Sequence, residues 1–404
     1  MKKKAFAGSH SFEERSAALE GLRNLKMARS AHAYVRGNTR QFYEWLESVN
    51  GLGVPKGPPI WICGDCHVGN LGPIANAKGR IDIQIRDLDQ TVIGNPAHDL
   101  IRLGLSLATA ARGSDLPGVT TVKMLEQVTE GYNQAFTQRP DVELAESEQP
   151  DAVRMAMREA LTRKWKQLAQ ERIEDTTPAI PLGKSFWPLS KAEKHEIHTL
   201  FGTEELRRLV TALGAREADA SVEVLDAAYW VKGCSSLGRL RYAVLLRVGG
   251  KKGESCLIDI KEATKPAAPR KRKAVMPGDN GERVVKGAWH LSPALGDRML
   301  AAKFDGHSVF LRELLPQDLK FDIEHLTRDE AVKVARFLAL VVGKAHARQM
   351  DDATRAKWQK EMTRNHSKTL DAPSWLWSSV VELIASHESA YLEHCRKYAM
   401  SSGV

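Results

Sequence analysis

The sequence predicts an α+β protein in which a small antiparallel sheet accompanies a larger, mainly helical part. Helical patterns occupy residues 1–57 and 120–214 and return after residue 316. Between 227 and 315 the chain changes to short runs rich in β-branched and aromatic side chains, as expected for strands. A glycine-rich stretch at 249–253 separates two of these runs, which is typical of an antiparallel hairpin.

Length and composition limit the class of protein. The chain has 404 residues and a mass of 44.8 kDa, which is enough for two or three folding units. Hydrophobic residues make up 43% and charged residues 27% of the chain, the balance of a globular protein. The apolar run at 337–343 is far shorter than the roughly 20 residues that span a bilayer. The basic N-terminus lacks the apolar core of a signal peptide, so we expect a cytoplasmic protein without a membrane span.

The first expected elements are two strands and a helix. The strands are placed at 59–63 and 80–86, the second with alternating apolar and polar side chains, and the helix begins near Asp99. A mainly helical region follows, in which Ser190 and Glu193 are spaced as a capping box at the start of a helix.

The β-rich segment and the end of the chain complete the prediction. Four strands are expected, at 228–231, 240–246, 256–260 and 308–311. Thr327 and Glu330 form a second capping box ahead of apolar positions that are spaced for one buried helix face.

An acidic constellation follows the first two predicted strands. Asp65 and Asn70 lie in the segment Cys63-Gly64-Asp65-Cys66-His67-Val68-Gly69-Asn70, and Asp87 and Asp89 follow the next strand. In a phosphotransfer site one Asp accepts the proton of the attacking hydroxyl, while carboxylate and Asn oxygens hold Mg²⁺. These residue types also fit ordinary turns, because Asp and Asn are turn formers next to Gly.

Rival motifs overlap the same stretch. Cys63-x-x-Cys66-His67 matches a c-type haem attachment site, although such attachment normally needs export and no export signal is present. A zinc site would need further Cys or His ligands, which the sequence does not group. A redox dithiol stays open, and two packing cysteines explain the pattern as well.

The second informative stretch is Gly233-Cys234-Ser235-Ser236-Leu237-Gly238, between two predicted strands. A glycine-rich hairpin can cover phosphates because its backbone approaches closely and its N–H groups point at the anion. We assign this role to Gly233, Ser235, Ser236 and Gly238. Lys261 lies on the next predicted strand, where kinase-type sites place a phosphate-pairing lysine. A plain hairpin and an exposed strand lysine are the alternative interpretation.

These motifs resemble those of the aminoglycoside phosphotransferase and choline kinase group. The resemblance is carried by Gly64-Asp65-x-His67-x-x-Asn70, by Asp87-x-Asp89 and by Gly94-Asn95-Pro96-Ala97-His98-Asp99-Leu100. It implies that Asp65, with His67 in the same motif, is catalytic, that Asn70, Asp87 and Asp89 bind the metal, and that Asp99 braces the catalytic loop. The pattern departs at Cys63, where that group usually has His, and at Asn95, where it has Asp.

A second resemblance covers most of the chain. It rests on the glycine and acidic motifs above together with Lys26-Met27, Tyr34-Val35-Arg36-Gly37, Lys261-Glu262-Ala263, Arg283-Val284-Val285 and Ala345-His346-Ala347-Arg348. By these motifs the chain is identified as a member of the bacterial family of domain of unknown function twenty-two fifty-two. That family has no settled activity, so this resemblance implies a pattern and no substrate.

The motif order implies a permuted arrangement. In kinases the glycine hairpin and its lysine precede the catalytic Asp, whereas here they follow it. We therefore expect a two-lobed, protein-kinase-like fold that is circularly permuted, as is tolerated where chain termini are exposed. Residues 1–225 would form the large-lobe catalytic segment and a helical region, 226–315 the small β-rich lobe over the nucleotide, and 316–404 the helices that complete the large lobe.

Three further residues receive nucleotide-site roles from this arrangement. Arg312 and Glu313 fall at the expected hinge between the lobes. Glu282 begins a helix-like run after Lys261 and is our choice for the acid that positions this lysine, because kinase sites pair it with a helical Glu. A solvated acid in the first turn of a helix is the alternative for Glu282.

The sequence thus favours an ATP- and Mg²⁺-dependent phosphotransferase that acts on the hydroxyl of a small molecule or a protein. The alternatives are transfer of a nucleotidyl (AMP) group at the same site, and a nucleotide- or nucleic-acid-binding protein without turnover. The basic excess, 59 Lys and Arg against 50 Asp and Glu, permits a polyanionic partner. However, the basic stretch at 265–273 lacks the aromatic side chains on which single-stranded nucleic acid stacks.

Overall fold

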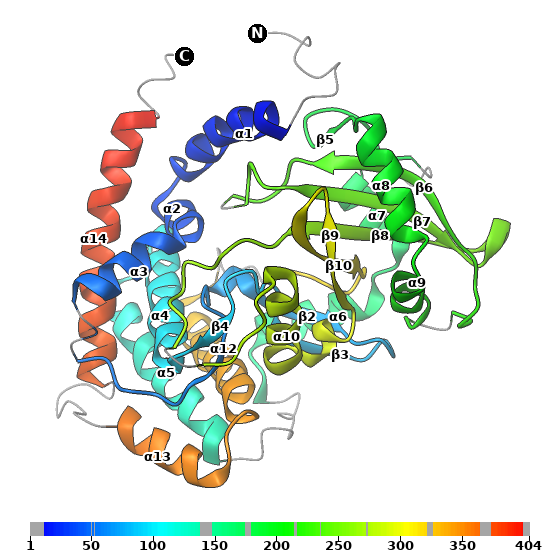
Figure 1. Cartoon of the computed structure of the whole chain (residues 1–404). Helices are drawn as coiled ribbons and strands as arrows, with labels where there is room; N and C mark the ends of the chain where they lie inside the picture. Colours follow the sequence, from blue (N-terminus) through cyan, green and yellow to red (C-terminus); the bar gives the residue numbers. More distant parts are fainter. Residues whose placement is uncertain are drawn as a thin grey trace.

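The computed structural model has a six-stranded sheet on one side and a group of helices on the other, with two short strand pairs near their junction (Figure 1). It describes residues 12–49, 51, 53–137, 148–173, 179–213, 216–234, 236–271, 274–320, 326–363 and 373–398. The predicted α+β class is confirmed. Within the described ranges, no helix combines the length and the apolar character that crossing a membrane requires.

The large sheet is antiparallel throughout, with the strand order β5-β6-β7-β8-β10-β9. Its strands are β5 (Phe186–Trp187), β6 (Val222–Trp230), β7 (Arg241–Val248), β8 (Glu254–Glu262), β9 (Met299–Phe304) and β10 (His307–Leu314). Between β8 and β9 the chain forms α10 (Asn280–Leu291) and the short α11 (Pro293–Gly296). The glycine-rich stretch around Gly250 makes the β7–β8 turn, as the sequence predicted.

Helices cover both faces of this sheet, because successive residues of a strand project in opposite directions. Tyr242 and Val244 of β7 face a core shared with α8 (Lys191–Phe201) and α9 (Glu204–Thr211). Ala243 faces the opposite core, which is shared with α7 (Trp165–Ile173). The predicted capping box of Ser190 and Glu193 is present at the start of α8.

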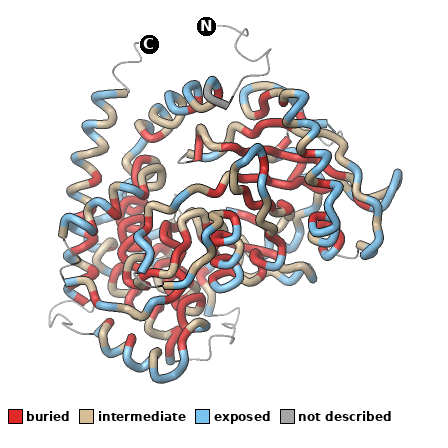
Figure 2. Tube along the Cα trace, in the orientation of Figure 1, coloured by how far each residue is buried: buried red, intermediate tan, exposed pale blue. Residues whose placement is uncertain are grey.

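The helical part contains the largest hydrophobic core. Its helices α5 and α12 pack closely because Gly131 and Gly343 place no side chain between them. A Cβ on Gly343 would come within 2.7 Å of the Ala135 Cβ, and one on Gly131 would clash with a backbone carbonyl of α12. The helices of this part and of its periphery are α1 (Phe12–Met27), α2 (Ala31–Gly37), α3 (Thr39–Ser48), α4 (Pro96–Gly113), α5 (Gly118–Thr137), α6 (Asp151–Thr162), α12 (Arg328–Ala347), α13 (Asp352–Met362) and α14 (Ser374–Tyr398). Figure 2 shows burial concentrated where these helices meet and along the strands of the sheet.

Two small antiparallel pairs carry the acidic motif. β1 (Ile60–Ile62) pairs with β4 (Val92–Gly94), and β2 (Leu71–Ala75) pairs with β3 (Ile81–Ile85). A single 3-10 turn, η1 (Val68–Asn70), separates the loop after β1 from β2. The four strands therefore bring the loop after β1 and the loop after β3 to the same region.

The expected segment boundaries can be compared with the observed helices and strands. The boundary expected between 225 and 226 falls within β6, and β5 and the helices α7, α8 and α9 pack on the same sheet although they precede that boundary. The boundary between 315 and 316 falls just after β10. The sheet and its covering helices therefore extend beyond residues 226–315, the segment with the β-rich sequence.

Candidate functional site

The loop after β1 makes a sharp turn that only glycine accommodates. Gly64 has a φ of 75°, in the left-handed region that favours glycine. A Cβ at this position would also clash with the Gln90 carbonyl. The Tyr43 hydroxyl donates to the Gly64 carbonyl at 2.7 Å and fixes the turn from the side of α3. This turn sets the direction in which Asp65 projects.

Asp99 is hydrogen-bonded to the backbone of the same loop. Its carboxylate accepts hydrogen bonds from the backbone N–H groups of Cys63 at 2.7 Å and Gly64 at 2.9 Å. His346 Nε2 lies 3.1 Å from the same carboxylate, and the other ring nitrogen lies 2.9 Å from the Tyr132 hydroxyl. Since the Trp358 indole donates to that hydroxyl at 3.0 Å, the Tyr132 proton is left for His346 Nδ1. His346 then donates its Nε2 proton to Asp99.

Asp65 is held by a buried cation. The Arg102 Nε donates to Asp65 Oδ1 at 2.9 Å, while its Nη2 donates to the Val35 carbonyl at 2.6 Å. The Asn70 amide nitrogen donates to the Asp65 carbonyl at 3.0 Å, which leaves the Asn70 amide oxygen as the atom for a ligand. His67 is buried, and burial, with Arg36 and Arg102 nearby, lowers its pKa well below the ordinary value, so the imidazole is neutral.

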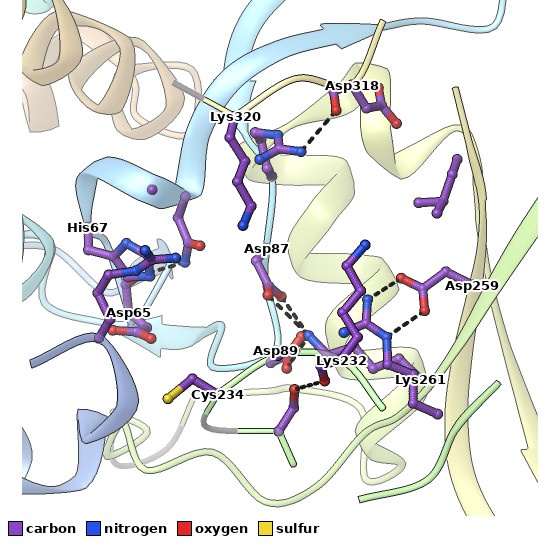
Figure 3. Close-up of a pocket in the computed structure, with 18 of the residues that line it drawn as sticks. Asp65, His67, Asp87, Asp89, Lys232, Cys234, Asp259, Lys261, Asp318 and Lys320 are labelled. Carbon is purple, nitrogen blue, oxygen red and sulfur yellow. Dashed lines mark hydrogen bonds and ion pairs between the residues drawn. The ribbon is translucent and has the colours of Figure 1, made fainter. Parts of the chain in front are cut away.

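The loop after β3 meets strand β8 through Lys261. The Lys261 ammonium lies 3.1 and 3.0 Å from the two carboxylate oxygens of Asp87 and 2.6 Å from Asp89 Oδ2 (Figure 3). The Asp87 side chain is 43% exposed and faces the cavity, whereas that of Asp89 is 14% exposed. Residues 174 positions apart thus form one cluster.

The electrostatics of the two acids differ. Burial raises the pKa of Asp89, and the neighbouring Asp87 carboxylate raises it further. Burial opposes ionisation of Asp87 as well, but the Lys261 ammonium outweighs it and lowers the pKa of Asp87. Asp89 Oδ1 is buried and has no hydrogen-bond partner within the described residues. This unpartnered oxygen can accept a cation.

The glycine hairpin forms the turn between β6 and β7. Gly233 has a φ of 103°, and a Cβ there would clash with the Ser236 side chain. The Lys26 ammonium donates to the Gly233 carbonyl at 3.2 Å. Gly233, Cys234 and Ser236 line the cavity. Ser235, which the sequence assigned to the same role, lies outside the described residues.

These stretches enclose one cavity of about 520 Å³, within the range of small-ligand sites. The predicted residues that line it are Asp65, His67, Asn70, Asp87, Asp89, Gly233, Ser236, Lys261 and Arg312. Arg312 also donates to the Arg86 carbonyl at 2.8 Å, which connects the end of β10 to the loop after β3.

Three predicted residues lie elsewhere. Gly238 follows the turn and lies near Ser16 instead of the cavity. Glu313 is buried and forms a bidentate ion pair with Arg216 at 2.7 and 2.8 Å, on the opposite face of β10. Glu282 is exposed in the first turn of α10, so Lys261 is positioned by Asp87 and Asp89 rather than by a helical Glu.

Two functional contacts were missed by the sequence interpretation. Arg283, next to Glu282, is buried and donates to the carbonyls of Asp89 at 2.9 Å and Thr264 at 3.0 Å, so α10 supports the acidic loop. Arg241 and Asp259 form a buried bidentate ion pair at 2.8 and 2.6 Å beside Lys261. Strand alternation could have found this pair, because Asp259 and Lys261 share one face of β8.

The cysteines do not form the rival sites within the described residues. Cys63 and Cys66 are buried free thiols. The hydrogen bond between them and their burial raise the pKa of Cys63, so its thiol is not activated. No three His, Cys, Asp or Glu side chains of the described ranges are grouped as a metal site. Mg²⁺, in contrast, is usually bound by one or two carboxylates together with substrate phosphates and water, and the oxygens of Asp87, Asp89 and Asn70 fit that need.

Comparison with known proteins gives one match. The sequence profile of a family described as "Uncharacterized protein conserved in bacteria (DUF2252)" matches residues 15–397. No curated protein and no solved structure matches the chain significantly.

Proposed function

The chain belongs to this bacterial family, DUF2252, and from the geometry of its cavity we propose that it is an ATP- and Mg²⁺-dependent phosphotransferase that acts on a hydroxyl group. The observation that carries the proposal is the position of Lys261. A lysine on the strand after a glycine turn contacts two carboxylates of metal-binding type, in a cavity that also contains Asp65. Phosphoryl transfer needs these parts together.

The order of elements in the sheet supports a kinase-like arrangement. The glycine turn joins β6 to β7, Lys261 lies on β8, and a helix, α10, follows. Kinases use the same succession of glycine-rich loop, lysine-bearing strand and helix. Here the succession follows the catalytic loop in the chain, so the proposed fold is a circular permutation of that arrangement.

The catalytic chemistry would begin at Asp65. Its Oδ1 is held by Arg102, so the carboxylate is fixed and can accept the proton of the acceptor hydroxyl. The hydroxyl oxygen then forms a bond to the terminal phosphorus of ATP, the bond from that phosphorus to the bridging oxygen breaks, and ADP leaves. Asp99 acts on this step through the backbone of the Asp65 loop, and is therefore a positioning residue.

Asp87, Asp89 and the Asn70 oxygen would hold Mg²⁺, which when bound neutralises phosphate charge and orients the triphosphate. Without nucleotide, Lys261 neutralises the two acids itself. We expect Lys261 to move to a phosphate oxygen when the metal takes its place on the carboxylates. The backbone of Gly233 and the Ser236 hydroxyl would cover the phosphates from the hairpin side.

Thermal unfolding with ATP and Mg²⁺ tests the proposal, because a ligand that binds the folded state raises its stability by mass action. We expect the midpoint of the parent chain to rise with ATP and Mg²⁺ together and to rise much less with ATP in the presence of a chelator. Asp87→Asn should lose most of this shift, whereas Asp219→Asn, an exposed acid outside the cavity, should keep it. Equal midpoints with and without MgATP would overturn the proposal.

The products distinguish the alternatives at the same site. Transfer of a phosphoryl group releases ADP, transfer of a nucleotidyl group releases pyrophosphate, and a binding protein releases neither. We expect ADP. Nucleotide-dependent stabilisation without any product would support a protein that binds nucleotide but does not turn it over.

A further inference from the structure

Most of the basic residues of the cavity belong to one of two groups. Ten Lys and Arg side chains line it against five Asp, so cations outnumber acids. The first group is paired: Lys261 with Asp87 and Asp89, and Arg241 with Asp259. The charges of this group balance one another, so they do not require a further anion.

The second group, here called the basic cluster, comes from five separate elements. Arg36 is near the end of α2, Arg86 follows β3, Arg172 is near the end of α7, Lys232 follows β6, and Lys320 lies after β10. In Figure 3 the Lys320 side chain points toward Asp87 from the wall opposite Lys261. Five separate elements thus direct positive charge into one space.

The basic cluster has few acidic partners. Arg86 Nη2 donates to the Asp318 backbone carbonyl at 3.1 Å, but the Asp318 carboxylate is already bound by Arg298 at 2.9 and 3.1 Å. Glu171 lies 3.3 Å from Arg172 but is shared with Arg163. Within the described part of the chain, Lys232 and Lys320 form no ion pair with a carboxylate, and Lys232 stacks over the Trp230 ring at 4.1 Å.

Several donors of the basic cluster are also unused. The Nε atoms of Arg36, Arg86 and Arg172 are buried and lack hydrogen-bond partners among the described residues. A buried donor that lacks an acceptor destabilises a fold. With the Nε of Arg312, four such donors line one cavity, where an anionic acceptor would satisfy them.

The cations of the basic cluster repel one another. Burial lowers the pKa of Lys232, and Arg172 and Arg241 lower it further. Burial, Arg36 and Arg86 lower the pKa of Lys320 in the same way. An anion bound among these groups would offset the desolvation of their charges and reduce the repulsion between them.

The nucleotide is not the best occupant of the basic cluster. In the proposed function, Lys261 and the metal on Asp87 and Asp89 meet the triphosphate, and the metal adds positive charge to the cavity. Within the basic cluster, Arg36 instead borders the loop of the proposed base. A Cβ on Gly69 would lie 3.1 Å from the Arg36 guanidinium carbon and 3.2 Å from the His67 ring, so Arg36 packs against that loop.

We propose that the basic cluster binds the phosphate of the acceptor, so that the substrate is a small hydroxyl compound which already carries a phosphate group. This inference rests on the proposed function, because it places the acceptor next to Asp65. Arginine and lysine together suit a phosphate, which accepts several charge-assisted hydrogen bonds at once. The cavity of about 520 Å³ admits a phosphorylated small molecule beside a nucleotide tail but no folded macromolecule.

Calorimetric titration of inorganic phosphate tests this site. The full chain is first saturated with Mg²⁺ and a non-hydrolysable ATP analogue, and phosphate is then added. We expect phosphate to bind to this complex, and Lys232→Met and Lys320→Met each to weaken phosphate binding at least tenfold. Both variants should keep the affinity for the ATP analogue within threefold. The matched control is Lys251→Met, an exposed lysine in the β7–β8 turn, which should change neither affinity.

The outcomes separate the two proposals. Nucleotide binding without any phosphate binding would overturn the acceptor site and leave the phosphotransferase intact. Loss of nucleotide affinity as large as the loss of phosphate affinity would also overturn it, because the basic cluster would then belong to the nucleotide. Phosphate binding without Mg²⁺-dependent nucleotide binding would overturn the proposed function instead, and with it the identification of the phosphate as part of an acceptor.

Discussion

Two buried polar regions of this molecule contain similar side chains but differ in how many of their polar atoms have a hydrogen-bond partner. Around Asp99, the carboxylate, two backbone N–H groups, His346, Tyr132 and Trp358 form a continuous series in which each member has a partner. In the cavity, Asp89 Oδ1, His67 Nδ1 and four arginine Nε atoms have none among the described residues. A network that is complete without ligand stabilises the fold, whereas unpartnered donors and acceptors that line a cavity are available to a ligand.

The largest expected effect is on catalysis at the cavity. Asp65→Asn keeps an acceptor for Arg102 but removes the base, so ADP formation should fall about 10²–10⁴-fold. The affinity for MgATP should change less than threefold, because the acids that face Lys261 are untouched. Steady-state ADP release and calorimetry measure the two quantities. An Asp65→Asn protein with undiminished turnover would remove Asp65 from the chemistry.

In the complete network the expected effect is on stability. Asp99→Ala leaves two buried N–H groups and His346 without their acceptor, so the free energy of unfolding should fall by about 3–5 kcal/mol. Urea unfolding followed by circular dichroism gives this value. A loss below about 1 kcal/mol would show that the loop after β1 is held by other contacts, and the contrast between the two regions would disappear.

The paired acid of the cavity gives a pH-dependent test. Burial alone would raise the pKa of Asp259, but the bidentate Arg241, with Arg312 further away, outweighs burial and lowers the pKa to about 2. A depressed pKa contributes stability above the unfolded value near 4, and this contribution is lost as the pH falls from about 4 to about 2. Asp259→Asn should therefore destabilise the protein by about 2 kcal/mol at pH 7 and by much less near pH 2. A destabilisation that is the same at both pH values would contradict the role assigned to this ion pair.

The smallest expected effect, and the one of opposite sign, concerns the basic cluster. Lys232→Met removes a charge that its neighbours repel while retaining most of the side-chain volume, so the unfolding midpoint without ligand should stay equal or rise. Phosphate should stabilise the parent more than the variant. A clear fall of the midpoint, with Lys251→Met unchanged, would place Lys232 among the residues that hold the fold together.

Much of the fold was predictable because its signals are local. The alternating strand before Asp87, the capping box at Ser190 and the glycine turn between β7 and β8 each depend on neighbouring residues only. β2 was not predicted, since Pro73 and Gly72 weaken its β pattern. The full extent of the sheet, including β5, depends on pairing between distant segments and leaves no local signal.

The site was predictable in part for the same reason. Residue chemistry singled out Lys261 and Asp87, and the fold brings them together. Sequence spacing could not show which acid contacts Lys261. Glu282 and Arg283 are neighbours in α10, and only the fold shows that Arg283 faces the loop after β3 while Glu282 does not. The basic cluster was missed because its five members come from five elements and are separated by long stretches of sequence.

The central claim is that Lys261 and the acids after β3 hold the same triphosphate, and a crystal structure of the full chain with Mg²⁺ and a non-hydrolysable ATP analogue tests it most directly. The proposed function predicts a phosphate oxygen within hydrogen-bond distance of Lys261 Nζ and a Mg²⁺ about 2.0–2.1 Å from a carboxylate oxygen of Asp87. Lys261 still bound to both Asp87 and Asp89, with the nucleotide held elsewhere or absent, would contradict it.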